Sequence, residues 1–285
     1  MTSDSGAPLS ARITALAALP AGAPSPEDPL VLIDELLTQL ESGAIRAAER
    51  DANGVWRAVP WVKQGILIAF RFGAMADLSA DSGAFSFVDK HTIPPRRFAP
   101  EDGVRIVPGG STIRRGACVA AGVVCMPPMF VNVGAWIGAG TMVDSHALVG
   151  SCAQVGARVH LSAAAQVGGV LEPVGATPVI IEDDVVIGGN CGVYEGAVVR
   201  ERAVLGAGVV LTRGTPVYDL VKEKVYRATA EAPLEIPAGA VVVPGARAIR
   251  AAWAAEQGLA VQTPVIVKYR DERTDLATAL ESWLR

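Results

Sequence analysis

The run "TMVDSHALVG" places a carboxylate and an imidazole two residues apart, Asp144 and His146, in an otherwise apolar stretch. A positioned carboxylate or imidazole can take a proton from a reacting amine or hydroxyl. The residues that follow Asp144 are also polar, so a simple solvated turn is the weaker explanation for it. His146 fits a general base and an exposed turn residue equally well. The run therefore predicts acid–base chemistry centred on Asp144.

A second carboxylate, Glu195, lies in the segment "NCGVYEG". It could work together with Asp144 in acid–base chemistry, or it could be an ordinary solvated turn residue. The residue types alone favour neither interpretation.

Bulk properties exclude several classes of protein. The net charge of −4 and the lack of a long basic run give no reason to expect nucleic-acid binding. Asp4 stands where a signal peptide has positive charge. Residues 121–143 carry no charge, but Pro127, Pro128 and an apolar period of six contradict a membrane helix. Cysteines without paired spacing indicate free thiols in a reducing compartment. We therefore expect a cytoplasmic protein with no membrane or nucleic-acid partner. The cysteines are Cys118, Cys125, Cys152 and Cys191.

An internal repeat defines the elements that position these residues. Aliphatic residues recur at every sixth position, and four residues after each of them the side chain is usually small or β-branched. Because six is a multiple of two, both positions point to the same side of short strands, whereas six fits neither a helix nor a coiled coil. Glycine after many aliphatic residues allows sharp turns. The aliphatic positions are Ile113, Val119, Val131, Ile137, Val143, Val149, Val155, Leu161 and Val167, with Cys125 in one gap, and then Ile181, Ile187, Val193, Val199, Leu205, Leu211 and Val217.

This hexapeptide pattern is typical of a parallel β-helix, which for this signature is left-handed and triangular. The predicted fold is mainly β, with the left-handed parallel β-helix over residues 105–250 and a loop insertion at 215–235. We predict a flexible N-terminus over 1–26 and a small α-rich domain over 27–104. There "PEDPLVLIDELLTQLESGAI" predicts a capped helix, and "VPWVKQGILIAFRF" a helix or a strand. A C-terminal strand and helix over 251–285 would cover the open end of the coil.

Stacking the hexads assigns the turn residues to three edges of the coil. Between Val167 and Ile181 the ladder skips fourteen residues, which we interpret as two hexads with a two-residue bulge. One edge then carries only small residues, and its backbone amides could receive a long, thin ligand such as a pantetheine arm. Equally, glycine could merely ease each turn. That edge comprises Gly150-Ser151, Gly168-Gly169, Gly188-Gly189 and Gly206-Ala207. A second comprises Asp144-Ser145, Ser162-Ala163, Glu182-Asp183 and Arg200-Glu201, and a third comprises Gly138, Gly156 and Tyr194-Glu195.

In this alignment Asp144 and Glu195 lie on different edges, with Glu195 about three layers further on. They could share a site most easily across a contact between subunits, which predicts a symmetric oligomer. Three-fold symmetry suits a three-sided prism.

The histidines do not predict a metal site. A γ-type carbonic anhydrase on this scaffold would bind zinc through three histidines. Here His91 lies outside the repeats, and His146 and His160 are fourteen residues apart. We therefore predict no metal.

The same segments carry a resemblance to a known family. They closely resemble 2,3,4,5-tetrahydropyridine-2,6-dicarboxylate N-succinyltransferases of lysine and diaminopimelate biosynthesis, over most of Leu36 to Val267. The resemblance implies a β-helical homotrimer with active sites between subunits. It also implies succinyl-CoA as co-substrate, a small dicarboxylic amino-acid acceptor and no tightly bound cofactor. The matching segments are "LLTQLESGAIRAAERDANGVW", "GVRIVPGGSTIRRGA" and "VNVGAWIGAGTMVDSHALVGSCAQVGARVHLSAAAQVGGVLEPVGATPVIIEDD".

The resemblance also implies roles for individual residues. Asp144 in "TMVDS" matches the carboxylate that meets the amino group of the acceptor. Arg105 in "GVRIVP" matches an arginine that binds an acceptor carboxylate, for which a bidentate guanidinium is well suited. We expect Asp144 and Glu195 to be catalytic, with Arg105, Asn132 and His146 beside Asp144 in the acceptor site. The expected CoA-binding residues are Ser151, Gly169, Gly189 and Ala207.

Two positions depart from the family pattern. Gly192 stands where members of the family have a glutamate, so either Glu195 takes over that role or the reaction proceeds without it. His146 stands in place of a tryptophan, and its role is open. A cation that grips the succinyl carboxylate should exist, and Arg200 and Arg213 are candidates. The alternatives are an acetyl-CoA-dependent transferase on a similar amine and a non-catalytic β-helix scaffold.

Overall fold

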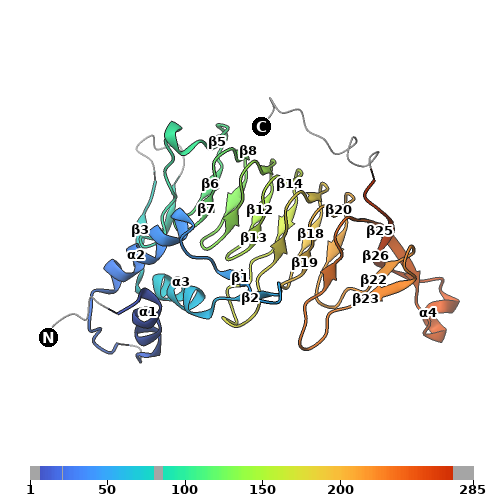
Figure 1. The fold of residues 1–285 in the computed structure, drawn as a ribbon, viewed down its shortest axis with the longest axis horizontal. Helices are drawn as coiled ribbons and strands as arrows, with labels where there is room; N and C mark the ends of the chain where they lie inside the picture. The colour runs from blue at the N-terminus through green and yellow to red at the C-terminus, as the bar shows by residue number, and fades with distance from the viewer. Residues whose placement is uncertain (1–6, 21, 80–85, 272–285) are drawn as a thin grey trace.

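A computed structural model describes residues 7–20, 22–79 and 86–271, in which short parallel strands stack into the three sides of a prism (Figure 1). Successive hexads pass from side 1 to side 2 to side 3 and back to side 1. Side 1 consists of β7 (Cys118–Val119), β10 (Trp136–Ile137), β13 (Gln154–Val155), β16 (Ile180–Ile181), β19 (Val198–Val199) and β24 (Glu235–Ile236). The coil part of side 2 consists of β5 (Arg105–Ile106), β8 (Val124–Cys125), β11 (Met142–Val143), β14 (His160–Leu161), β17 (Val186–Ile187), β20 (Val204–Leu205) and β25 (Ala240–Ala248). Side 3 consists of β6 (Thr112–Ile113), β9 (Phe130–Val131), β12 (Leu148–Val149), β15 (Gln166–Val167), β18 (Gly192–Val193) and β21 (Val210–Leu211).

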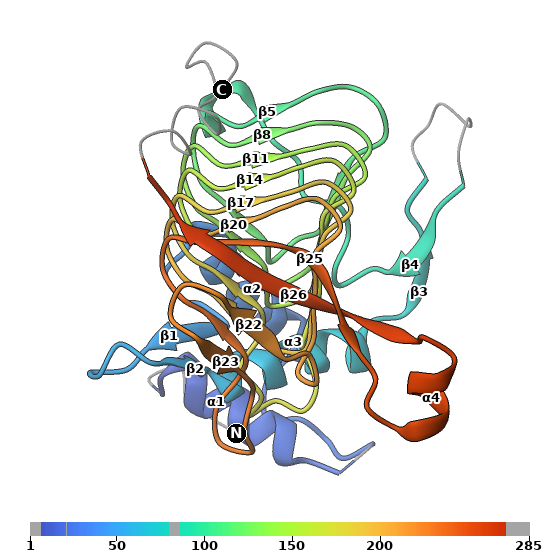
Figure 2. The same cartoon turned by 90° about the vertical axis from the view of Figure 1, so that its right-hand side faces the viewer.

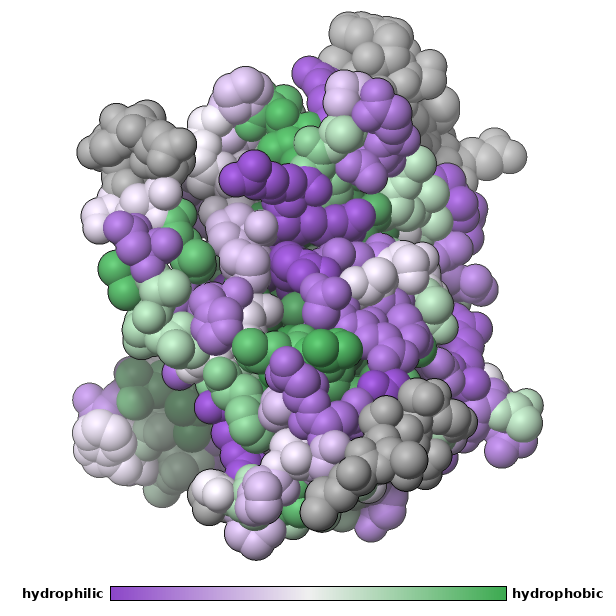
Figure 3. Space-filling model, turned by 90° about the vertical axis from the view of Figure 1, so that its left-hand side faces the viewer, coloured by the Kyte–Doolittle hydropathy of each residue, from purple (hydrophilic) through white to green (hydrophobic). Residues whose placement is uncertain are grey.

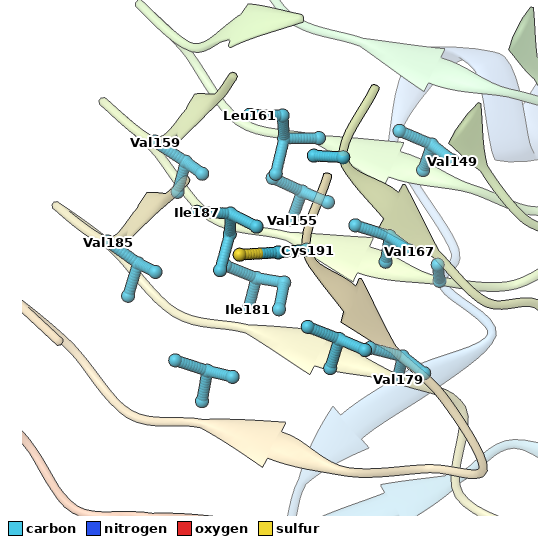
Figure 4. Packing of buried hydrophobic residues seen from close by; sticks show 14 of the residues in the cluster. Val149, Val155, Val159, Leu161, Val167, Val179, Ile181, Val185, Ile187 and Cys191 are labelled. Atoms are coloured by element: carbon cyan, nitrogen blue, oxygen red, sulfur yellow. The ribbon is translucent and has the colours of Figure 1, made fainter. Parts of the chain in front are cut away.

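The interior of the prism is filled by the predicted aliphatic ladder. Val149, Val155 and Leu161, one from each side, are fully buried, and so are the small residues four positions later in the hexad. Figure 4 shows these side chains meeting in a thin, continuous core along the coil axis. Because every second residue of a strand points outward, the residue before each aliphatic one points away from the coil axis, although on side 1 residues such as Gln154, Ile180 and Val198 are buried. The period of six therefore predicts correctly which side chains fill the interior of the coil and which point away from it.

The interruption after β15 differs from the prediction. Trp136 pairs with Gln154, 18 residues on, whereas Gln154 pairs with Ile180, 26 residues on. The insertion is thus an eight-residue loop within a single turn, not two hexads with a two-residue bulge. The loop is held by the N-terminal domain, because Lys63 Nζ donates to the carbonyl oxygen of Ala176 at 2.5 Å and Leu171 packs against the helical core.

This correction reassigns every edge beyond the loop. The 1–2 edge carries Gly138, Gly156, Glu182 and Arg200. The 2–3 edge carries Asp144, Ser162, Gly188 and Gly206. The 3–1 edge carries Asn132, Gly150, Gly168, Tyr194 and Thr212. The small residues predicted to form one edge therefore lie on two. Gly150 and Gly168 are on the 3–1 edge, and Gly188 and Gly206 are on the 2–3 edge.

The N-terminal domain contains three helices, α1 (Leu9–Ala18), α2 (Pro29–Ser42) and α3 (Pro60–Phe72). The prediction for α2 is confirmed, with Asp28 accepting from the amide of Leu30 at its start and Gly43 in the left-handed conformation at its end. The prediction of a flexible segment over 1–26 is wrong for α1, because Leu9, Ile13 and Leu16 are buried in the helical core. "VPWVKQGILIAFRF" forms a helix, and not a strand.

The helices pack directly on one edge of the coil. Val133 and Cys152 of the 3–1 edge belong to the core of the helices. Two small hairpins complete the domain, β1 (Ala48–Arg50) with β2 (Trp56–Ala58) and β3 (Met75–Asp77) with β4 (Val88–Lys90). A 3₁₀ turn, η1 (Pro100–Asp102), precedes the coil. This end of the molecule presents mainly hydrophilic side chains, broken by several apolar patches (Figure 3).

The C-terminal end of the coil is covered by long strands (Figure 2). β25 joins side 2 and then pairs in an antiparallel manner with β26 (Ala260–Tyr269), and the short helix α4 (Ala252–Glu256) connects them. The predicted loop at 215–235 contains a hairpin of β22 (Val217–Asp219) and β23 (Lys224–Tyr226), and β22 also pairs with β26. The predicted strand is thus present, while the helix predicted after it lies outside the described residues.

Candidate functional site

The outer face of side 2 brings together two of the predicted residues. Arg105, Met142 and His160 occupy equivalent outward positions on β5, β11 and β14, with one strand between the first two. Asp144 follows β11 directly, at the 2–3 edge. Arg105 and Asp144 thus lie on and beside one exposed face of the coil.

Asp144 is held by two contacts. Its Oδ1 accepts from the amide of Ser145 at 2.8 Å, and its Oδ2 lies 3.8 Å from Nε2 of His160. The side chains of Asp144 and His160 are 31% and 19% exposed, respectively. His160 was not among the residues predicted for the site, although it follows Met142 by 18 residues, one turn of the coil, and therefore stacks directly beside it.

His146 is an exposed turn residue, which was one of the two interpretations open for it. It is exposed, with φ at 63°, and its amide donates to the carbonyl oxygen of Pro128. Gln166 Nε2 in turn donates to the carbonyl oxygen of His146. The backbone of His146 therefore shapes the turn after Asp144, while the imidazole whose Nε2 lies 3.8 Å from Oδ2 of Asp144 is that of His160.

Asn132 is not brought to Asp144 within one chain. It lies on the 3–1 edge, where its Oδ1 accepts from the amide of Val133 at 2.9 Å and from Arg114 Nη1 at 3.4 Å. Asn132 could thus meet Asp144 only across a contact between two copies.

Glu195 also lies on the 3–1 edge, so the prediction that it and Asp144 occupy different edges is confirmed. It is two turns beyond Asp144, fewer than predicted, because the inserted loop adds no layer. Its carboxylate accepts from the amide of Arg213 at 2.8 Å. It lines a cavity of about 790 Å³ between the inserted loop and residues 230–233.

The glycine that replaces the family glutamate has a structural explanation. A Cβ at Gly192 would meet Cε2 and Cζ of Tyr194 at 2.4 and 2.9 Å. The Tyr194 ring thus occupies the space in which a side chain at 192 would lie. A carboxylate at 192 would require Tyr194 to move.

The four predicted CoA-binding residues fall into two pairs. Ser151 and Gly169 lie on the 3–1 edge, whereas Gly189 and Ala207 lie on the 2–3 edge. The predicted continuous groove is therefore wrong. A Cβ at Gly150 would lie 2.1 Å from the amide nitrogen of Gly169, so glycine is needed there for the turns to stack.

The cations proposed to grip a succinyl group are engaged elsewhere. Arg200, on the 1–2 edge, pairs with Glu182 at 2.9 Å and with Glu235 at 2.8 Å. Arg213, on the 3–1 edge, donates to the carbonyl oxygens of Thr229 and Ala230. Neither lies on the edge that carries Asp144.

Side 1 bears a second cavity, of about 780 Å³, under the β1–β2 hairpin. Arg46 lies 4.0 Å from the ring centroid of Trp136, and its Nε donates to the buried Gln154 at 2.9 Å. Burial lowers the pKa of the Arg46 guanidinium. Glu182, which is 5% exposed, accepts from Arg50 Nη2 at 2.7 Å and from Trp56 Nε1 at 2.8 Å. These contacts fasten the hairpin to side 1.

Replacement of Glu182 by Gln should destabilise the fold by about 2 kcal/mol at neutral pH, since it removes charge-assisted hydrogen bonds to cations that are partly exposed. Burial raises the pKa of Glu182, but hydrogen bonds from Trp56 and the amide of Glu201, with the charges of Arg200 and Arg50, outweigh it and hold the pKa below its usual value. The stabilisation is therefore present above the unfolded-state pKa of about 4.3 and lost as the pH falls through the lower folded-state pKa. Thermal unfolding at pH 7 and below pH 4 measures this difference.

Glu49→Gln is the matched control, because Glu49 is exposed at the same cavity. A Glu182→Gln protein with wild-type stability at neutral pH would contradict the assigned role.

Within residues 7–20, 22–79 and 86–271, no group of three or more His, Cys, Asp or Glu side chains is arranged to hold a metal ion. The four cysteines, all inside these ranges, are buried and have free thiols. None of the helices described there is long and apolar enough to cross a membrane.

Comparison with known proteins identifies the family. The model "Tetrahydrodipicolinate N-succinyltransferase N-terminal" matches residues 22–72, and "Hexapeptide repeat of succinyl-transferase" matches residues 178–213. The 2,3,4,5-tetrahydropyridine-2,6-dicarboxylate N-succinyltransferase of Rhodopseudomonas palustris is 40% identical over 259 residues, and that of Bradyrhizobium diazoefficiens 42% over 260 residues. Each alignment covers 89% of both chains. The chain belongs to the tetrahydrodipicolinate N-succinyltransferase family.

A crystal structure of a putative 2,3,4,5-tetrahydropyridine-2-carboxylate N-succinyltransferase from Campylobacter jejuni is also similar. It is 20% identical, with a TM-score of 0.47, and the match covers 82% of this chain and 62% of that one. Membership of the tetrahydrodipicolinate N-succinyltransferase family confirms the resemblance found in the sequence and the prediction of a left-handed parallel β-helix with a helical N-terminal domain.

Proposed function

We propose that this protein transfers the succinyl group of succinyl-CoA to the amino group of ring-opened tetrahydrodipicolinate, in lysine and diaminopimelate biosynthesis. The identity of about 40% with succinyltransferases over nearly the whole chain carries the proposal. The position of Arg105 and Asp144 at one exposed face supports it. We infer a cytoplasmic location, which suits an acyl-CoA-dependent biosynthetic enzyme and free thiols.

Acyl transfer from a thioester needs a neutral amine, a positioned thioester carbonyl and donors for the developing oxyanion. Asp144 orients the acceptor amine and takes its proton. Arg105 binds an acceptor carboxylate, for which its planar guanidinium is suited. Backbone amides in the turns of the coil supply the oxyanion donors. No tightly bound cofactor takes part in this scheme.

The corrected assignment of turn residues to edges suggests where the succinyl-CoA donor lies. Beyond Asp144, the 2–3 edge carries Ser162-Ala163, Gly188-Gly189 and Gly206-Ala207 in successive layers. Gly189 and Ala207 thus lie on the same edge as Asp144, while Ser151 and Gly169 lie on the 3–1 edge. We expect the pantetheine arm to follow the 2–3 edge towards β25, with its thioester at Asp144.

We propose a homotrimer in which side 2 of one copy faces side 3 of the next. Side 1 is covered by the β1–β2 hairpin, through Ala48 and Trp56 packed on Ile180 and Val198. Sides 2 and 3 instead leave apolar side chains partly exposed, which a contact between copies would bury. These include Met142, Val186, Phe130, Leu148 and Val210. Asn132, Tyr194 and Glu195, on the 3–1 edge, could reach the Asp144 edge only from another copy.

Light scattering tests the proposed homotrimer. A measured mass equal to that of one 29.5 kDa chain would contradict it.

Thiol release from succinyl-CoA and from acetyl-CoA, each with and without tetrahydrodipicolinate, tests the reaction. We expect release that requires the acceptor and is faster with succinyl-CoA. Faster release with acetyl-CoA would support the acetyltransferase alternative. Absence of acceptor-dependent release with either donor would favour the scaffold.

A further inference from the structure

His160 is placed to act on the proposed catalytic carboxylate. β14 lies between β11 and β17, and the outward neighbours of His160 on those strands are Met142 and Val186, neither of which is charged. The carboxylate that faces it is Asp144, with Oδ2 3.8 Å from Nε2. The other oxygen of Asp144 is fixed by the amide of Ser145, so the carboxylate cannot turn freely.

Other charged groups near β14 are either distant or already paired. Arg105 is on the same face, three strands away across β8 and β11. Arg158, on the turn before β14, forms an ion pair with Asp184 at 2.7 Å. Asp144 is the acidic side chain that the structure places within 4 Å of Nε2 of His160.

A carboxylate alone is a poor acceptor for the proton of an aliphatic ammonium group. The usual pKa of an Asp is about 3.9, whereas that of a Lys ammonium is about 10.4. An imidazole has a usual pKa of about 6.5, which is closer to the pKa of the ammonium group than that of a carboxylate is. It is also the side chain best suited to accept and release a proton near neutral pH. A hydrogen-bonded pair of the two groups is therefore a better base than Asp144 alone.

We propose that His160 is a positioning residue that holds Asp144 and stores the proton that Asp144 takes from the acceptor amine. This inference rests on the proposed function and adds a residue to its machinery. In the complex with acceptor, the distance between Oδ2 and Nε2 closes to a hydrogen bond, since such contacts are often long in the absence of substrate.

The proton balance is complete without another reactant. An N–H bond of the acceptor ammonium breaks, and its proton passes through Oδ2 of Asp144 to Nε2 of neutral His160. The amine lone pair attacks the thioester carbon, and the C–S bond breaks. The second proton lost by the nitrogen goes to the departing thiolate, giving the CoA thiol. The imidazolium then releases its proton to solvent.

A histidine NMR titration tests the pairing without reference to activity. The chain has three histidines, which makes each ring resonance assignable by substitution. Loss of the carboxylate in Asp144→Asn should lower the pKa of His160, because a neighbouring negative charge favours the imidazolium. The ring resonances of His91, which contacts Ala74 outside the coil, provide the internal reference. An unchanged titration of His160 would overturn the proposal, whether or not the chain transfers succinyl groups.

Kinetics of His160→Gln test the role in proton transfer. Glutamine can donate a hydrogen bond to Asp144 but cannot store a proton, so we expect kcat to fall about 100-fold with little change in the KM for the acceptor. The acidic limb of the wild-type pH–rate profile, which requires neutral His160, should be absent from the variant. His91→Gln should retain the wild-type rate and profile. A wild-type rate and profile in His160→Gln would overturn the proposal. If His160→Gln does not fold, the titration of Asp144→Asn decides.

Discussion

Replacement of Asp144 by Asn should lower kcat for succinyl transfer by about 100- to 10,000-fold while leaving the affinity for CoA nearly unchanged. Asparagine has the same shape and can still accept from the amide of Ser145, as Oδ1 of Asp144 does. It cannot take the amine proton, so the loss falls on the chemical step and not on donor binding. Thiol release at saturating substrates measures kcat, and calorimetric titration measures CoA binding.

Asp183→Asn provides the matched control for this experiment. Asp183 is an exposed turn carboxylate on the 1–2 edge and accepts from the amide of Ala157. Its substitution should leave kcat unchanged. Near-normal turnover in Asp144→Asn would remove Asp144 from the mechanism. An equal decrease in kcat in both variants would indicate a general effect of removing a charged residue from a turn.

Replacement of Gly150 by Ala should cost about 3 kcal/mol of stability or more and lower the melting temperature by about 10 °C. The new methyl group would lie 2.1 Å from the amide nitrogen and 2.6 Å from Cα of Gly169 in the next turn. Both are backbone atoms, so no side chain can rotate away, and two layers of the coil must separate. Thermal unfolding followed by circular dichroism measures the effect.

Gly175→Ala is the control, because a Cβ there would meet no atom within 4 Å. Gly175 lies in the inserted loop, and its substitution should leave the melting temperature within about 1 °C of wild type. A wild-type melting temperature in Gly150→Ala would mean that glycine on this edge serves a ligand and not the stacking of the coil.

The sequence alone identifies the coil because its evidence is local and repeated. Every hexad places an aliphatic residue in the core, so Val143, Val149 and Val155 indicate the same geometry independently of one another. The start of α2 could be predicted for a similar reason, since Asp28 and Pro29 act on the adjacent backbone.

The length of the insertion after Val167 could not be obtained in this way. Spacing alone does not distinguish two hexads with a small bulge from one hexad with an eight-residue loop. The contacts of Lys63 with Ala176 and of Leu171 with the helical core select the loop, and both join segments about 100 residues apart in sequence. Because the length of the loop was assigned wrongly, Gly189 and Ala207 were predicted on the same edge as Ser151 and Gly169, whereas they lie on a different one.

For the site, the sequence by itself determined, through the period of six, that Asp144 and Arg105 lie on the outside of the coil, and the family motifs around them predicted their roles. Only the tertiary structure decided what surrounds Asp144. Stacking of strands places His160 beside it, His146 contributes its backbone to the turn, and Asn132 lies on another edge. The physical reason is that a side chain's direction follows from its own hexad, whereas its neighbours depend on how many residues separate one turn of the coil from the next.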